Sequence, residues 1–150
     1  MHFKDALPMA THPTSPCSTP PADVEWRLTR HPRNVGRARR LLRDQAGRWL
    51  LADDVTETAV LLVSELVTNA CRHTRVPADR YTAVRCLLRG GSIRVEVSDA
   101  DPELPRQRLA STDDECGRGL ALVEALAKDW GAHPRPSGIG KTVWFELACP

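Results

Sequence analysis

Three polar residues that could do chemistry recur at intervals of four in the stretch LVSELVTNACRHT, residues 62–74. They are Glu65, Asn69 and His73, and this spacing places them on one ridge of a helix. A glutamate can act as a general base, and an amide oxygen is a hard ligand of the kind that Mg²⁺ prefers. The spacing alone decides little, because the protein's own hydrogen bonds can also hold such a trio.

The ridge intrudes on the apolar face of the expected helix. With Leu62 set at 0°, the apolar residues fall in an arc of about 100° centred near 45°. His73 falls at about 20°, inside the arc, Asn69 at about 340°, on its edge, and Glu65 at about 300°, on its flank. Polar groups at a buried edge need hydrogen-bond partners, so a purely solvated ridge would not lie this way. The arc consists of Val55, Ala59, Leu62, Val63, Leu66 and Ala70.

A glycine-rich helix start follows downstream, in the sequence GRGL at residues 117–120. Glycines there let backbone N–H groups approach a phosphate, and a helix N-terminus favours its negative charge. Arg118 could add charge-assisted hydrogen bonds. A second stretch, GIGKT at residues 138–142, lacks the full spacing of a Walker phosphate loop and leads into a strand, so we exclude that kind of site.

Hydrophobic periodicity predicts the elements that position these residues. Helices are expected over 33–51, 55–73 and 117–131, the last ended by Gly131, with a loop over 100–116. Gly90 and Gly91 predict a two-residue hairpin. This order predicts an α+β fold, a two-layer sandwich in which helices cover one face of a mixed, mostly antiparallel sheet. Its strands are expected over 24–29, 81–89, 92–99 and 141–148.

Length and composition indicate one globular domain of 150 residues, with 41% hydrophobic and 27% charged residues. Residues 1–22 are rich in Pro, Ser and Thr and predict a disordered tail before a domain over 23–150. No apolar run approaches the roughly 18 residues of a membrane span, and no signal peptide is evident, so a cytoplasmic protein is expected. Five cysteines without a Cys-x-x-Cys pair argue against a disulfide framework and a zinc site.

The joint pattern over about residues 24–148 resembles bacterial anti-sigma factor type serine/threonine kinases. These form a small-domain branch of the GHKL superfamily, with gyrase, heat-shock protein 90, histidine kinases and mismatch-repair ATPases. SELVTNACRH resembles the N-box, VEVSDADPELP the first glycine box, GRGLALV the second, and GKTVWFEL the closing strand. Histidine kinases usually carry Asn where Glu65 stands, so the resemblance favours the serine kinase branch.

The resemblance implies a Bergerat-type ATP site. Glu65 would be the general base toward a serine hydroxyl, Asn69 would ligate Mg²⁺, and Asp99 would accept a hydrogen bond from the adenine amino group. The glycine-rich helix start would line the triphosphate, and Thr142 would support the adenine end. The implied cofactor-binding residues are Asn69, Asp99, Gly117, Arg118, Gly119, Leu120 and Thr142.

The resemblance also implies phosphorylation of a serine on an anti-sigma factor antagonist, control of a sigma factor, and a homodimer. The segment Asp99–Glu103, however, keeps the aspartate of the family's Asp-x-Gly-x-Gly box and lacks both glycines. A catalytically weak or inactive partner-binding module of the same fold therefore stays open. A third alternative is a nucleic-acid-binding protein that uses the Arg-rich helix 33–51, although no aromatic residues interleave there to stack on bases.

Overall fold

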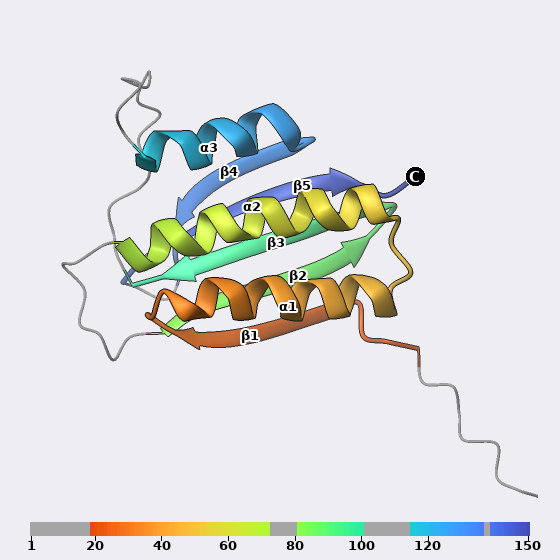
Figure 1. The fold of residues 1–150 in the computed structure, drawn as a ribbon, viewed down its shortest axis with the longest axis horizontal. Helices are drawn as coiled ribbons and strands as arrows, with labels where there is room; N and C mark the ends of the chain where they lie inside the picture. The colour runs from red at the N-terminus through yellow and green to blue at the C-terminus, as the bar shows by residue number, and fades with distance from the viewer. Residues whose placement is uncertain (1–18, 73–80, 101–114, 137–138) are drawn as a thin grey trace, which may run out of the picture.

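The computed structural model describes residues 19–72, 81–100, 115–136 and 139–150. In these ranges five strands form one sheet, and three helices lie on one of its faces (Figure 1). The predicted α+β two-layer architecture is confirmed. The elements in chain order are β1 (Asp23–Thr29), α1 (Arg33–Arg48), α2 (Asp53–Arg72), β2 (Tyr81–Arg89), β3 (Ser92–Asp99), α3 (Glu115–Leu126), β4 (Asp129–Pro134) and β5 (Lys141–Ala148).

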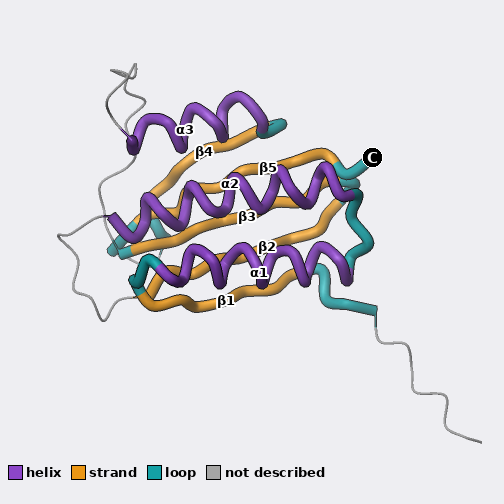
Figure 2. Tube along the Cα trace, viewed as in Figure 1, coloured by secondary structure: helices purple, strands orange, loops and turns teal. Residues whose placement is uncertain are grey.

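The strands of this sheet follow the order β1-β2-β3-β5-β4, and each of these four neighbouring pairs is antiparallel (Figure 2). Gly90 and Gly91 join β2 to β3 with φ angles of 53° and 78°, which confirms the predicted two-residue hairpin. Since the hairpin aligns β2 with β3, the alternation of each strand presents one apolar face to the helices.

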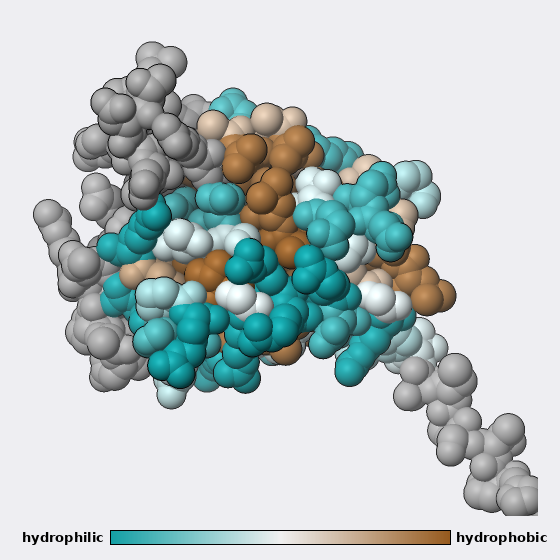
Figure 3. All heavy atoms as spheres, viewed as in Figure 1, coloured by the Kyte–Doolittle hydropathy of each residue, from teal (hydrophilic) through white to brown (hydrophobic). Residues whose placement is uncertain are grey.

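The hydrophobic core lies between that face and the helices, with α2 placed between α1 and α3 (Figure 1). All six apolar residues predicted to face inward from α2 are buried. On the outer side of the helices, hydrophilic residues cover the region of α1, whereas hydrophobic side chains gather over α2 and α3 (Figure 3). Leu61 and Leu126 are among the exposed large hydrophobic residues of these two helices.

The first helix ends at Arg48, three residues before its predicted end. Leu50 adopts a positive φ of 57° and is exposed, while Trp49 and Leu51 pack against the core. The backbone N–H groups of Leu50 and Leu51 donate to Gly47 and Ala46, so the last carbonyls are satisfied by a turn. Helical periodicity includes Trp49 and Leu50 because these apolar residues follow Ala46 at three-to-four spacing, but Leu50 is exposed.

The third helix and the segment after it differ from the prediction. The helix runs from Glu115 to Leu126, and β4 follows at Asp129–Pro134, where helix up to Gly131 was expected. Gly131 lies in mid-strand, where a Cβ would come within 2.9 Å of the Trp144 ring of β5. The glycine therefore accommodates a neighbouring aromatic ring, and the strand, which was not predicted, forms the sheet edge.

Some predicted features lie outside the described residues: positions 1–18 of the expected tail, His73, and positions 101–114 of the expected loop. The end of the expected tail contacts the domain, because the Trp49 indole N–H donates to the Pro21 carbonyl at 2.9 Å and the Leu88 N–H donates to Ala22 at 2.8 Å. Among the helices that the structure describes, none has the length and apolar character needed to cross a bilayer.

Gly140, which precedes β5, provides the first testable prediction. Its φ is 116°, and a Cβ there would overlap the Asp99 carbonyl oxygen and approach Ala100 Cα to 3.1 Å. We expect Gly140→Ala to lower the free energy of unfolding by about 1–3 kcal/mol, because both the backbone conformation and the close approach are lost. Denaturant titration measures this change.

The matched control is Gly47→Ala in α1, where a Cβ meets nothing within 4 Å. It should stabilise the protein by about 0.5–1 kcal/mol, as expected for alanine in a helix. Equal effects from the two substitutions would contradict the importance of the Gly140 contact.

Candidate functional site

Glu65 and Asn69 lie on the side of α2 that faces away from α1. Glu57, at about 220° on the same helical wheel, forms an ion pair with Arg43 of α1, with Nε and Oε1 3.2 Å apart. Glu57 therefore lies on the outer side of α2, opposite the buried arc. One flank of the helix, at about 120° to 160°, is buried through Thr56, Val60 and Val67, and Glu65 and Asn69 occupy the other flank at about 300° and 340°. The helix α3 lies on that flank (Figures 1 and 2). Both side chains are half-buried, so they can contact a ligand without being fully solvated.

Asp99 ends β3 and Lys141 begins β5, and the two are paired across the strands. They share the core face, since Asp99 is in phase with Val97 and Lys141 with Val143. Lys141 Nζ lies 3.4 Å from Asp99 Oδ2, and their side chains are only 4% and 7% exposed. A buried charge is costly unless it is paired, so each of these groups depends on the other.

These residues belong to elements that meet at one end of the molecule, which we call the candidate edge. The C-terminal end of α2, the end of β3, the start of β5 and the N-terminus of α3 all lie at the left of Figure 1. The first four N–H groups of an α-helix have no partner within the helix. In α3 these belong to residues 115–118, which include Gly117 and Arg118 of the predicted phosphate-binding segment. The edge therefore combines a glutamate and an amide on α2 with a buried carboxylate and a helix N-terminus.

The remaining predicted site residues are placed as follows. The segment Gly117–Gly119 lies inside the first turns of α3, because the helix begins two residues earlier than expected. The Arg118 side chain lies outside the described part of the structure. Leu120 is half-buried and packs against the core. Since backbone N–H groups rather than side chains carry this part of the prediction, the early helix start is compatible with it for Gly117 and Arg118. Gly119 and Leu120 lie beyond the first four N–H groups, so the early start does not favour their predicted role.

Thr142 lies on the other face of the sheet from Asp99. It is paired with Ser98, and the two hydroxyl oxygens are 2.7 Å apart. Its expected role at the adenine end stays a prediction, and the neighbouring residue on the Asp99 face is Lys141. Sequence reasoning missed Lys141, although its phase with Val143 and Phe145 could have indicated that it faces the core.

The thiols of Cys71, Cys86 and Cys149 are not activated nucleophiles. Burial raises the pKa of the Cys86 thiol to about 12 and also raises the pKa values of Cys71 and Cys149. A thiol of raised pKa has little of the reactive thiolate form. Within the described ranges, moreover, His, Cys, Asp and Glu side chains form no group of three or more that could hold a metal ion.

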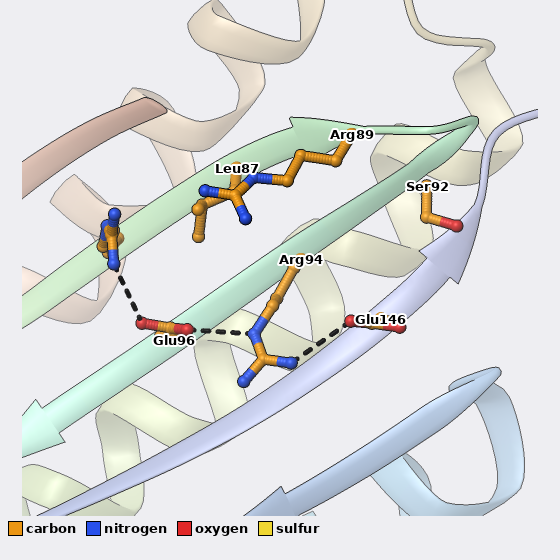
Figure 4. Close-up of a pocket in the computed structure, with 7 residues that line it drawn as sticks. Leu87, Arg89, Ser92, Arg94, Glu96 and Glu146 are labelled. Atoms are coloured by element: carbon orange, nitrogen blue, oxygen red, sulfur yellow. Dashed lines mark hydrogen bonds and ion pairs between the residues drawn. The ribbon is translucent and has the colours of Figure 1, made fainter. Parts of the chain in front are cut away.

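The face of the sheet without helices carries a hollow of about 340 Å³ (Figure 4). Arg94 lies at its centre, between Glu96 and Glu146 at 2.9 Å and 3.2 Å, and above the Trp144 ring at 3.9 Å. These charges neutralise one another, and partly exposed ion pairs of this kind contribute modestly to stability. The hollow thus has the features of a solvated sheet face, and the candidate site is the edge near Asp99.

Comparison with known proteins bears directly on this edge. A family model described as "Histidine kinase-like ATPase domain" matches residues 28–147. The chain belongs to this family. All the predicted site residues fall within the matched range, and so does each element that forms the candidate edge.

Solved structures with the same fold include two bacterial proteins. The RsbU and RsbW domains of Rv1364c from Mycobacterium tuberculosis are similar with a TM-score of 0.65 and 20% identity, over 84% of this chain and 32% of that chain. The histidine kinase domain of the Erythrobacter litoralis blue-light activated histidine kinase is similar with a TM-score of 0.52 and 22% identity, over 81% of this chain and 62% of that one. Both likenesses show that this ATPase-domain fold is shared.

A sequence relative is the uncharacterized protein SCO4941 of Streptomyces coelicolor, 45% identical over 51 residues. The matched segment covers 33% of this chain and 49% of the Streptomyces protein. The similarity therefore concerns about half of that relative.

The raised pKa of Cys86 gives a second testable prediction. In the native protein at pH 8, iodoacetamide should leave Cys86 unmodified, because a pKa of about 12 leaves almost no thiolate and the side chain is buried. Peptide mapping by mass spectrometry measures the modification. The same peptide from urea-unfolded protein serves as the control and should be alkylated. Equal modification in the two states would contradict the burial of this thiol.

Proposed function

We propose that this protein is an ATP-dependent serine/threonine kinase of the anti-sigma factor type. Its substrate is a serine of an anti-sigma factor antagonist protein, and its binding partner is a sigma factor. The observation that supports this best is the position of Glu65 and Asn69 on the α3-facing flank of α2, at the edge that also carries Asp99. The similar Mycobacterium tuberculosis protein, which contains an RsbW domain, adds support for this branch.

The residues at the edge fit ATP and Mg²⁺ by their chemistry. The amide oxygen of Asn69 is a hard ligand for Mg²⁺, and the α3 N-terminus offers N–H groups to phosphate oxygens. The Asp99 carboxylate is buried and paired with a cation, so it is an acceptor suited to the adenine amino group. Bound Mg-ATP would supply the γ-phosphoryl group and the charge neutralisation that its transfer needs.

Glu65 has the role of general base in this proposal. It accepts the proton of the substrate serine while the serine oxygen forms a bond to the γ-phosphorus. The bond between that phosphorus and its bridging oxygen breaks, and ADP leaves with the electron pair. A half-buried carboxylate on a rigid helix is well suited to hold a hydroxyl in one orientation.

The proposed setting is the cytoplasm, where ATP and sigma factors meet. We also propose that the protein acts as a homodimer, with the outer side of α1 or the β1 edge of the sheet as the contact surface. The strand β1 ends the sheet, so a second copy can reach its outer edge.

A second candidate function is a partner-binding module of this fold with weak or absent phosphoryl transfer. The observation that favours it is the first glycine box, where the segment Asp99–Glu103 lacks both glycines of the family pattern. Without those glycines the backbone has less freedom to approach a nucleotide closely. Such a module would still bind its partner through the same domain.

Nucleotide binding gives the third testable prediction. Millimolar Mg-ATP should raise the melting temperature, because a ligand that binds only the native state stabilises it by about 2.7 kcal/mol at 100 times its dissociation constant. Differential scanning fluorimetry measures the shift. Its absence at saturating Mg-ATP would count against the kinase and favour the module without nucleotide use. Tight, salt-sensitive DNA binding would instead support the Arg-rich α1 as a nucleic-acid surface.

Phosphoryl transfer gives the fourth testable prediction. Glu65→Gln should retain ATP binding and reduce the transfer rate by about 10²–10⁴-fold, the usual contribution of a general base. The measurement is transfer of label from γ-³²P ATP to recombinant anti-sigma factor antagonist proteins, tested singly.

The matched control is Glu57→Gln, on the outer side of the same helix, where Glu57 pairs with Arg43. It should leave the transfer rate unchanged. If Glu65→Gln transfers phosphate as fast as this control, the assignment of the base is wrong.

A further inference from the structure

Lys141 is buried in a row of apolar residues. The other core-facing positions of β5 are Val143, Phe145 and Leu147, which belong to the hydrophobic core. Lys141 is 3% exposed, and its Nζ lies 3.4 Å from Asp99 Oδ2. An apolar residue at this position would avoid the desolvation of a charge, so the strand itself does not require a lysine.

The backbone before Lys141 is shaped for this contact. Gly140 has a φ of 116°, and its missing side chain lets the start of β5 lie against the Asp99 carbonyl. The cross-strand pairing then places the two charged side chains directly opposite each other on the core face. Two independent features, the glycine and the register, thus bring the ammonium group to this carboxylate.

The ammonium group controls what Asp99 can bind. A nearby positive charge favours the ionised carboxylate, and an ionised carboxylate only accepts hydrogen bonds. It has about four lone-pair sites, so contact with Lys141 is compatible with a further bond from a ligand. Asp99 can therefore bind a ligand group that offers an N–H. A carbonyl oxygen at the same place is repelled, because its lone pairs face those of the carboxylate.

We infer that Lys141 is a specificity-determining residue of the nucleotide site: it holds Asp99 as a charged acceptor, and the site thereby selects a purine with a 6-amino group over one with a 6-oxo group. This inference rests on the proposed function, because it takes the base to lie at Asp99. Lys141 acts through Asp99 and is a positioning residue.

The test compares the dissociation constants of ATP and ITP, whose bases differ at position 6, by calorimetry with Mg²⁺. The unmodified protein should prefer ATP by roughly 10- to 100-fold, the range expected for a hydrogen bond to a charged group. In Lys141→Met the buried carboxyl group loses the ammonium group at 3.4 Å, which shifts it toward the neutral form, and the neutral form can donate to a carbonyl. The preference should then fall below about threefold, and Lys141→Arg should restore it because it keeps the positive charge.

The ratio of two affinities on one protein does not depend on the fraction that is folded. A Lys141→Met protein that keeps the original ATP preference within about twofold overturns the inference. Binding of ATP and ITP with equal affinity by the unmodified protein also overturns it. A folded, unmodified protein that binds neither nucleotide overturns the proposed function instead.

If Lys141→Met does not fold, Lys141→Gln keeps a hydrogen-bond donor beside Asp99 and removes the positive charge. The preference for ATP should again fall below about threefold, because the buried carboxyl group then shifts toward the neutral form. Retention of the original preference in this variant overturns the inference.

Discussion

The antiparallel pairing of β3 with β5 is the constraint on which the candidate site depends. Its register sets Asp99 opposite Lys141 on the core face and Ser98 opposite Thr142 on the other face. Because α2 packs on the same two strands, this pairing also fixes how the α2 flank lies relative to Asp99. A slip of β5 by one residue would turn Lys141 to the other face and bring the Thr142 hydroxyl group toward the helices. The backbone at Gly140 helps to hold this register, because only a glycine fits against the Asp99 carbonyl.

Much of this arrangement could be predicted from local patterns. Alternating apolar residues marked β2 and β3, and the two glycines between them marked the hairpin, because period two and positive φ are properties of short segments. The helical wheel of α2 identified its buried face, since the apolar arc of a helix of 20 residues is well sampled. The order of four motifs then indicated the family to which the chain belongs. The functional roles of Glu65 and Asn69 stay predictions that the geometry supports.

What could not be predicted depends on contacts between distant segments. The strand β4 has six residues that include a glycine and a proline, and only its pairing with β5 makes it a strand. The contact of Lys141 with Asp99 requires β5 to lie beside β3, although the phase of Lys141 along its strand indicates the core face. Thr142, which the family resemblance indicated, lies one residue away on the opposite face. The early end of α1 also depends on tertiary contacts. Trp49 is partly buried because it packs against the core, and not because it continues the buried face of the helix.

The most direct test of the account is a crystal structure of the protein with Mg²⁺ and a non-hydrolysable ATP analogue at saturating concentration. We expect the adenine amino group to lie within hydrogen-bond distance of Asp99. We also expect Mg²⁺ on the Asn69 oxygen and the triphosphate at the N-terminus of α3. An analogue bound in the hollow on the helix-free face, or no bound analogue at saturating concentration, would contradict the central claim that this edge is the nucleotide site.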